Sequence, residues 1–405
     1  MPEIMIERGL RHNAPDLVKA QLPCDTLHVV CDANTKQALA DELVQCFDGA
    51  VNYRLITLPR KLHATTATTD MLQKECANAS AILAVGSGTI NDLCKYSSYQ
   101  LGIPYGVWPT APSMNGYVSA NASLSHNGHK TSYAAHQPAA VWCDIDALNA
   151  APRRMVRAGL GDSLCRPTAQ ADWLLSHHLL GTPYDPTPFE LLAPYEEELF
   201  LHADKLIDGD PALTTLLMQT LLASGQGMHV AGSSAPASQG EHMIAHTMEM
   251  IYGSEQLNQL HGEQIGVTTL TMARIQHKML LKRPTIRATH RETDKFVRVF
   301  GNQLGQTLHE TYHRKALDDE RASAINDSLA TSWPELRDLL QSVMLSESKL
   351  AVVLRKARAK ISPSDLNWNN DRFENAVTHA YLSRDRFTFL DLGAMDIGKR
   401  YWFGE

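Results

Sequence analysis

The sequence predicts a two-domain protein, with a doubly wound parallel α/β sheet in residues 1–150 and an α-helical domain in residues 151–405. Two observations predict this fold class. In the first 150 residues, short apolar runs alternate with stretches of helical periodicity, as in a parallel sheet that is covered by helices. After about residue 150, strand signals almost vanish and long amphipathic stretches follow.

The strands of the N-terminal domain are expected at short apolar runs rich in β-branched and aromatic residues. The first run, TLHVVCD, precedes a helical pattern, TKQALADELVQCF, for which Asn34 or Thr35 can serve as the N-cap. The five expected strands are residues 26–32, 53–59, 81–86, 103–110 and 140–146. In the second half, helices are expected at residues 196–207, 212–232, 241–251 and 263–280.

Composition excludes several classes of protein. Hydrophobic residues make up 44% of the 405 residues, charged residues 20%, and the net charge is −7 without a basic patch, so no nucleic-acid partner is expected. No window approaches the roughly 18 apolar residues of a membrane span. The first residues lack the pattern of a signal peptide, and the seven cysteines are scattered singly. We therefore expect a cytoplasmic protein.

The stretch AILAVGSGTINDLCKY predicts a phosphate-binding turn between a strand and a helix. Gly86 and Gly88 allow close approach of a phosphate to the backbone, and Ser87 or Thr89 can cap the helix whose N-terminus faces an anion. A second loop, PTAPSMNG at residues 109–116, follows the next strand and lies where open α/β sheets place ligands. A turn with two glycines is by itself a weak signal and is more often an ordinary turn, and the second loop can equally be an ordinary turn.

Histidines and one aspartate form a candidate metal site in the helical half. His242 and His246 are separated by four residues and share one helix face, and His261 begins another helical stretch. Three protein ligands with an open position are typical of catalytic zinc, and Asp162 is a plausible further ligand or a simple helix cap. The spacing alone does not decide which of His242 and His246 binds metal.

Six segments occur in one order along the chain: GSGTINDLCKY, PTAPSMNGYVS, AGLGDSL, EHMIAH, HGEQIG and AYLSRDRFTFLDLG. Together they resemble the bacterial branch of the sn-glycerol-1-phosphate dehydrogenases, in the superfamily of glycerol dehydrogenase, iron-type alcohol dehydrogenases and 3-dehydroquinate synthase. The resemblance extends from about residue 25 to 400. It implies a Rossmann-like N-terminal domain and an α-helical metal-binding domain.

The resemblance also implies roles for individual residues. Asp162, His242 and His261 would bind the metal, and His246 would contact the substrate. Ser119 would lie beside the nicotinamide, and Asp32 would meet the adenosine ribose. The remaining cofactor-binding residues would be Gly86, Ser87, Gly88, Thr89, Ile90, Thr110, Ala111 and Ser113.

Two departures from the family pattern border the expected substrate pocket. The family usually has Asp where this chain has Asn115, and a Lys with an aromatic residue where this chain has Arg166 and Pro167. Pro167 would bend a helix unless it lies in the first turn. We expect Asn115, Asp162, Arg166 and His246 at the substrate, with His246 and Asn115 acting in catalysis and Arg166 meeting a phosphate group.

The resemblance implies reduction of dihydroxyacetone phosphate to sn-glycerol 1-phosphate by NADH or NADPH. One divalent metal is expected, with zinc favoured over nickel or iron, and the partner would be a small phosphorylated polyol or ketone. The chain could form a homo-oligomer. Two alternatives stay open at this point: a carbocycle-forming synthase with bound NAD, and a dinucleotide-binding protein with altered or no catalysis.

Overall fold

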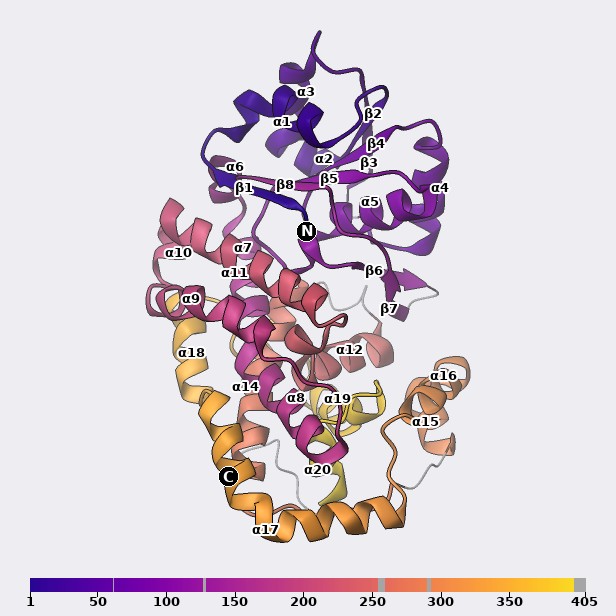
Figure 1. The fold of residues 1–405 in the computed structure, drawn as a ribbon, viewed down its shortest axis with the longest axis vertical. Coiled ribbons are helices and arrows are strands. Elements are labelled where there is room, and N and C mark those ends of the chain that lie inside the picture. The colour runs from indigo at the N-terminus through magenta and orange to yellow at the C-terminus, as the bar shows by residue number, and fades with distance from the viewer. Residues whose placement is uncertain (61, 127–128, 254–258, 290–292, 397–405) are drawn as a thin grey trace. The chain divides into compact units, whose positions relative to one another are not determined.

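The computed structural model describes residues 1–60, 62–126, 129–253, 259–289 and 293–396 (Figure 1). The chain forms two compact units that are interleaved in sequence. Unit 1 comprises Met1–Ser163, Leu191–Val230 and Lys356–Arg358, and unit 2 comprises Leu164–Glu190, Ala231–Arg355 and Ala359–Glu405. We expected a single boundary near residue 150; in the structure, the segment Leu191–Val230 groups with the N-terminal unit.

Unit 1 is built on a six-stranded parallel sheet with the order β1-β8-β5-β4-β2-β3. All five expected strands form. β1 was not expected; its short run EIMIE pairs with β8, and only three of its five residues are apolar. The strands are β1 (Glu3–Glu7), β2 (Leu27–Asp32), β3 (Tyr53–Leu58), β4 (Ala81–Gly86), β5 (Tyr105–Pro109) and β8 (Ala140–Asp144).

The strand order contains a point at which the direction of winding reverses. The chain passes from β2 outward to β3, returns to β4 on the other side of β2, and continues to β5 and β8. In doubly wound sheets, ligands bind outside the carboxyl ends of the strands at such a switch point. Here that position lies between Asp32, the last residue of β2, and the loop that follows Gly86 of β4.

Helices cover both faces of the sheet (Figure 1). One face packs against α1 (Ala14–Gln21) and α3 (Asp41–Phe47), and the other packs against α4 (Thr66–Glu75) and α5 (Gly88–Leu101). Alternate residues of β2 separate the two cores, since Val29 faces one and Val30 the other. Two buried cores therefore hold the strand ends in place.

The start of the first crossover helix corrects one expectation. Asp32, rather than Asn34 or Thr35, is the N-cap residue: its Oδ1 accepts hydrogen bonds of 2.8 Å from the backbone N–H groups of Asn34 and Thr35. Thr35 lies inside the helix and its hydroxyl accepts from the Asp32 N–H at 2.9 Å. The reciprocal pair satisfies donors that a helix start otherwise leaves unpaired. The helix continues from α2 (Ala33–Thr35) through a π-turn, η2 (Lys36–Ala40).

An antiparallel hairpin of β6 (Asn121–His126) and β7 (His129–Ala134) also forms in unit 1. It was not expected, because polar residues dominate both strands. The stretch 196–207, expected as one helix, is interrupted between Leu201 and Lys205. The other elements between β1 and residue 230, apart from α8, are η1 (Leu10–Asn13), η3 (Gly116–Val118), α6 (Ile145–Asn149), α7 (Arg153–Ser163), α9 (Thr187–Leu201), α10 (Lys205–Asp208) and α11 (Pro211–Val230).

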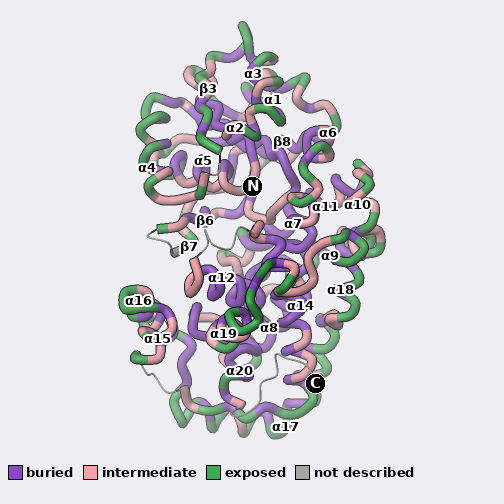
Figure 2. Tube along the Cα trace, turned by 180° about the vertical axis from the view of Figure 1, so that it is seen from behind, coloured by how far each residue is buried: buried purple, intermediate pink, exposed green. Residues whose placement is uncertain are grey.

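The regular secondary structure of unit 2 is all helical within its described residues. Its core includes residues of α8 (Arg166–Leu180), α12 (Gly240–Tyr252) and α14 (His261–Met279), and α12 and α14 are buried over most of their length (Figure 2). The remaining elements are η4 (Ala235–Ala237), α15 (Thr293–Phe300), α16 (Asn302–Tyr312), α17 (Asp319–Val343), α18 (Glu347–Lys356), η5 (Ser364–Leu366), α19 (Asn370–His379), η6 (Ala380–Leu382) and α20 (Phe389–Met395). Within the described ranges, no helix is both long and apolar enough to cross a membrane.

Candidate active site

The loop after β4 has the geometry of an anion-binding helix start. Ser87 is the N-cap residue of α5, yet its hydroxyl makes no capping hydrogen bond to the helix. The first N–H groups of an α-helix have no acceptor within the helix, so this turn presents donors and the positive end of the helix dipole together. Gly86 is required for packing, because an added Cβ would lie 2.6 Å from the Cβ of Ile90.

The loop after β5 lies directly beside this turn. Gly86 and Pro109 are register partners at the ends of β4 and β5, and the Thr110 N–H donates to the Gly86 carbonyl at 3.2 Å. The Tyr117 hydroxyl donates to the Ala111 carbonyl at 2.7 Å and fixes the loop's curvature. Thr110 and Ala111 are buried, and Ser113 is half-buried. The structure thus brings the two loops expected at the cofactor to one edge of the sheet.

A buried lysine that sequence analysis did not single out supports the second loop. Lys95 of α5 donates to the carbonyls of Gly116 (2.6 Å) and Asn121 (3.1 Å) and to the Ser119 hydroxyl (3.2 Å). Burial lowers the pKa of Lys95 to about 8. The Ser119 hydroxyl also lies 3.1 Å from the Gly116 carbonyl and 3.0 Å from that of Asn121. Ser119 therefore has a structural role, and its contact with a cofactor stays a prediction.

Asn115 is held by two hydrogen bonds within unit 1. Its backbone N–H donates to Asp162 Oδ2 at 2.9 Å, and its side-chain amide donates to the Ser224 hydroxyl of α11 at 3.2 Å. Asp162 is buried in the last turn of α7, so a helix N-cap role does not explain it. Gly159, one turn earlier, contacts the Pro112 carbonyl so closely that any side chain there would displace the loop.

Three histidines converge in unit 2. His242 and His246 lie one turn apart on α12, and His261 is the first residue of α14. Their ring centroids are separated by 5.1 Å (His242–His261), 5.8 Å (His246–His261) and 6.0 Å (His242–His246). The start of α14 is fixed by Glu263, which accepts from the Leu260 N–H at 2.9 Å. Imidazole nitrogens grouped in this way suit zinc, nickel or iron.

Glu241 orients the first histidine of this cluster. Its Oε1 lies 3.0 Å from His242 Nδ1 and accepts from the Gln239 N–H at 2.7 Å, while its Oε2 accepts from the Thr168 hydroxyl at 3.0 Å. Burial alone would raise the pKa of Glu241, but its interaction with His242 and the hydrogen bond from Gln239 lower it. A carboxylate on Nδ1 leaves the lone pair of the ring on Nε2, as in many metal sites.

Other side chains near the histidines have their own partners. His246 Nδ1 lies 3.4 Å from Glu249 Oε2. Cys165, with Glu241 and His242, forms a second set of potential ligands whose donor atoms all lie within 4.8 Å of one another. Arg166 donates to Gln170 Oε1 at 3.0 Å, and Pro167 occupies the first turn of α8, as the helix requires. A phosphate contact for Arg166 stays a prediction.

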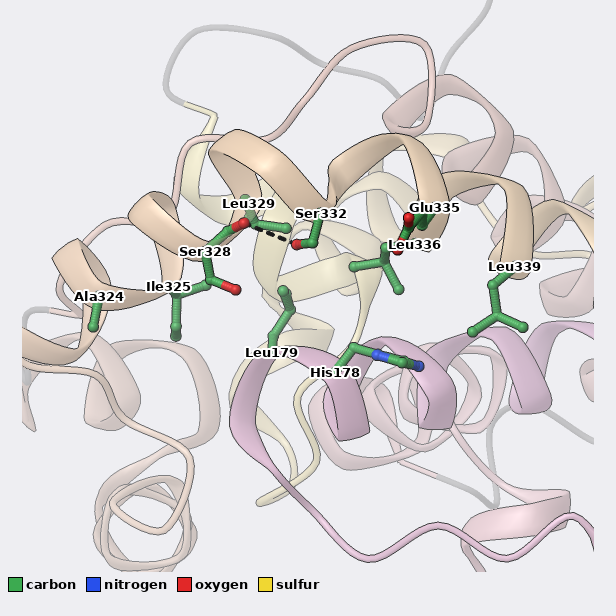
Figure 3. A pocket seen from close by; sticks show the side chains of 10 residues that line it. All are labelled: His178, Leu179, Ala324, Ile325, Ser328, Leu329, Ser332, Glu335, Leu336 and Leu339. Atoms are coloured by element: carbon green, nitrogen blue, oxygen red, sulfur yellow. Dashed lines mark hydrogen bonds between the residues drawn. The ribbon is translucent and has the colours of Figure 1, made fainter.

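A hollow of about 480 Å³ lies elsewhere, between α8 and α17, and its lining includes four leucines together with His178 and Glu335 (Figure 3). His178 is near the C-terminal end of α8, twelve residues after Arg166. Thr168, which contacts Glu241, lies ten residues before His178, or roughly 15 Å along the helix at about 1.5 Å per residue. The hollow is separate from the histidine cluster.

Relatives of this chain are found among curated proteins. Glycerol-1-phosphate dehydrogenase [NAD(P)+] from Geobacillus stearothermophilus is 31% identical over 315 residues, which cover 77% of this chain and 71% of the relative. This chain belongs to the glycerol-1-phosphate dehydrogenase family. The relative of the same name from Bacillus subtilis is 29% identical over 96% of this chain and 90% of its own length. Residues 5–152 also match the family model described as iron-containing alcohol dehydrogenase.

Solved structures show the same fold at low sequence identity. Glycerol dehydrogenase from Schizosaccharomyces pombe has a TM-score of 0.58 at 17% identity and covers 89% of this chain and 93% of its own. An archaeal alcohol dehydrogenase from a Red Sea brine pool has a TM-score of 0.66 at 12% identity, with coverage of 97% and 95%. Membership of the glycerol-1-phosphate dehydrogenase family favours an oxidoreductase over the synthase and the regulatory binding protein.

Proposed function

We propose that this enzyme reversibly reduces dihydroxyacetone phosphate to sn-glycerol 1-phosphate, with NADH or NADPH as the hydride donor and with a divalent metal ion. The observation that carries the proposal is the convergence of His242, His246 and His261 in a chain of the glycerol-1-phosphate dehydrogenase family. Catalysis by hydride transfer requires the chain to bind a dinucleotide, to orient a ketone and to manage one proton.

The dinucleotide is assigned to unit 1. The N–H groups at Gly88, Thr89 and Ile90 would bind the pyrophosphate, with Gly86 allowing the turn and Ser87 adding a hydroxyl. Thr110, Ala111 and Ser113 would lie along the nicotinamide. Support comes from the switch point of the sheet, where both loops and Asp32 meet. Because Asp32 Oδ1 already caps a helix, Oδ2 would receive the ribose hydroxyl.

The metal ion is assigned to Asp162, His242 and His261. One carboxylate and two neutral imidazoles form a ligand set that zinc accepts, with a position left for substrate. When bound, such an ion supplies a Lewis acid for the ketone oxygen. Support for Asp162 comes from its burial and from Cys165, three residues later, which lies close to His242. Glu241 fixes the orientation of His242 from the opposite ring nitrogen.

His246 is assigned to the substrate. Its pairing with Glu249 at 3.4 Å orients the ring, so that the other ring nitrogen can hydrogen-bond a substrate hydroxyl and move its proton. Asn115, held by Asp162 and Ser224, would present its amide oxygen to the same substrate. Neither residue would carry a permanent negative charge, which suits a phosphorylated substrate.

The test is a steady-state assay of NADH and NADPH oxidation with dihydroxyacetone phosphate, with the product resolved by chirality. We expect turnover with this ketone, faster than with unphosphorylated dihydroxyacetone, and the product sn-glycerol 1-phosphate. The sn-glycerol 3-phosphate enantiomer as product would contradict the proposal. So would a chain that retains metal and dinucleotide but shows no net cofactor oxidation.

A further inference from the structure

Two arginines lie close together in the segment between η6 and α20 of unit 2. Arg384 donates to the Ser238 hydroxyl at 3.0 Å, and Arg386 donates to the Ser238 carbonyl and to the Ser234 hydroxyl, the latter at 2.8 Å. Both arginines are half-buried. A guanidinium has five N–H donors. Within the described ranges, Arg384 uses one and Arg386 two, so most donors of the pair remain for another acceptor.

The pair carries two positive charges whose contacts are all to neutral oxygens. In the part of the chain that the structure describes, no carboxylate lies within 4.0 Å of either guanidinium. Asp385, between them in sequence, pairs with Arg314 at 3.1 Å, and Glu241 is engaged by His242 and Thr168. Burial and the charge of Arg384 lower the pKa of Arg386 to about 9, and burial lowers the pKa of Arg384. Asp385 and Glu241 offset part of this lowering of both pKa values without pairing with either arginine. Adjacent guanidiniums whose hydrogen-bond acceptors are all neutral favour an anion between them.

The surrounding structure fixes both arginines before any ligand binds. The buried Lys315 donates to the carbonyls of Tyr381 (2.6 Å) and Arg386 (2.8 Å), at the two ends of the segment, and pairs with Asp391 at 2.7 Å. The Lys315 ammonium therefore fixes the backbone of this segment at both of its ends. Such preorganisation reduces the entropy lost on binding.

A second buried carboxylate connects this segment to the histidine helix. Asp172 accepts the Phe389 N–H through Oδ1 and the Gly240 N–H through Oδ2, each at 3.0 Å. Gly240 begins α12, and Ser238, which contacts both arginines, precedes His242 by four residues. Four residues span at most about 14 Å, even when fully extended. The residue that contacts both arginines thus lies at most about 14 Å along the backbone from His242.

We propose that Arg384 and Arg386, with the hydroxyls of Ser234 and Ser238, bind the phosphate group of the substrate. The inference rests on the proposed function and specifies how its substrate class is selected. The ligand chemistry is a phosphate monoester dianion, for which paired guanidiniums supply several charge-assisted hydrogen bonds. The 2′-phosphate of NADPH has the same chemistry and serves as the second source to be distinguished.

The experiment compares Arg384→Gln and Arg386→Gln with a matched control, Arg314→Gln. Arg314 pairs with the same loop, but its side chain is 75% exposed. Each variant is assayed with dihydroxyacetone phosphate and with unphosphorylated dihydroxyacetone, using NADH and then NADPH. Binding of inorganic phosphate to each protein is measured separately by calorimetry, so that the site is tested without turnover. Circular dichroism and thermal unfolding confirm that each variant folds.

We expect each glutamine variant to raise KM for dihydroxyacetone phosphate by about 10- to 100-fold and to weaken phosphate binding by a similar factor. Activity with dihydroxyacetone and the NADPH-to-NADH ratio should change less than threefold, and Arg314→Gln should match the wild type. Arg386→Lys keeps the positive charge but loses the paired N–H donors of the guanidinium, so its KM for dihydroxyacetone phosphate should lie between those of the wild type and Arg386→Gln. If Arg386→Gln does not fold, Arg384→Gln and Ser234→Ala carry the test.

Failure of this inference is distinct from failure of the proposed function. Wild-type turnover of the phosphorylated ketone with unchanged KM in both glutamine variants would overturn the phosphate site and leave the activity intact. A selective loss of NADPH affinity would also overturn it and assign the pair to the cofactor. Absence of turnover, together with phosphate binding that Arg384 and Arg386 control, would support the anion site while the proposed reaction fails.

Discussion

His242 Nδ1 lies 3.0 Å from Glu241 Oε1, and both side chains are buried. Residues adjacent in a helix usually point to different faces, but here both lie in the first turn of α12, where Glu241 also accepts a backbone N–H from Gln239. The carboxylate therefore anchors the helix start and sets the tautomer of the imidazole at once. Its removal should affect the metal before it affects the fold.

Glu241→Gln should lower the affinity for the metal ion by about 10- to 100-fold, as is typical for the outer partner of a metal-bound histidine. The amide retains the shape but loses the charge that favours an Nδ1-protonated ring. Metal affinity would be measured by competition with a chromogenic chelator. Glu249→Gln is the matched control, since Glu249 faces His246. Equal affinity in Glu241→Gln and the wild type would show that the charge of Glu241 does not support the metal site.

The histidines should separate into two classes. His242→Ala and His261→Ala should lose the ion and the activity with the fold retained, whereas His246→Ala should keep about one ion per chain and lose turnover. Metal content by mass spectrometry and rates of NAD(P)H oxidation would be measured on the same samples. The reverse result, in which His246→Ala loses the ion and His242→Ala keeps it, would exchange the two assignments. Cys165→Ser should leave the ion in place.

Gly88→Val should weaken NADH binding by about tenfold or more, because a branched side chain would project from the first turn of α5. An added Cβ at Gly88 would lie 3.3 Å from the Met114 sulfur, so packing also changes. The variant is therefore compared with Gly88→Val/Met114→Ala, which relieves that contact. Fluorescence titration with NADH is the measurement. Normal NADH affinity in both proteins would remove this loop from the cofactor site.

Asn115→Asp should change the rate by about tenfold or less, which corresponds to ~1.4 kcal/mol. Ser224 can donate to the new carboxylate instead of accepting from the amide. The added negative charge near Asp162 should favour a divalent ion and disfavour an anionic substrate. Rates with dihydroxyacetone phosphate and dihydroxyacetone would be compared, with Ser224→Ala as the control. A wild type inert with both, and strong activity in the variant, would point to another substrate.

The ion pair between Arg11 and Asp144 predicts how unit 1 responds to acid. Burial alone would raise the pKa of Asp144, but hydrogen bonds from Arg11, of which the Nε bond is 2.9 Å, lower it. A carboxyl with a lowered pKa stabilises the fold above its unfolded value of about 3.9 and loses this contribution as pH falls through the folded value. Chemical denaturation at pH 7 and pH 3 should show a smaller acid-induced loss in Asp144→Asn than in the wild type. Equal losses would show that the pair is not linked to folding.

Sequence patterns predicted the parallel sheet well because its central strands are buried on both faces and appear as continuous apolar runs, as in AILAVG. They missed β1 and the hairpin β6–β7, where few apolar residues carry a signal. The spacing of His242 and His246 indicated one helix face. Pairing them with His261 depends on the packing of α12 against α14, which no local pattern contains.

The arginine pair illustrates a different limit of sequence analysis. Arg384 and Arg386 belong to a segment that carries the family resemblance, and no local sequence pattern indicates that Ser234 and Ser238 contact them. Glu241 was adjacent to a candidate ligand, but neighbours in a helix seldom interact. The contacts of the arginine pair and of Glu241 both depend on tertiary packing, which the periodicity of a local sequence does not show.

Unit 1 is assembled from segments that are far apart in the sequence, which has a consequence for synthesis of the chain on the ribosome. Its sheet is complete by Asp144, but Met218 and Leu222 of α11 belong to the core on one face, and they follow some seventy residues later. Because the ribosome adds about 5–20 residues per second, α11 is synthesised several seconds after the sheet that it covers. During this interval the nascent sheet carries an exposed apolar surface, which is the condition under which a chaperone is most useful. A chain truncated at Ser163 should bind a hydrophobic dye and aggregate, whereas the full-length chain should do neither.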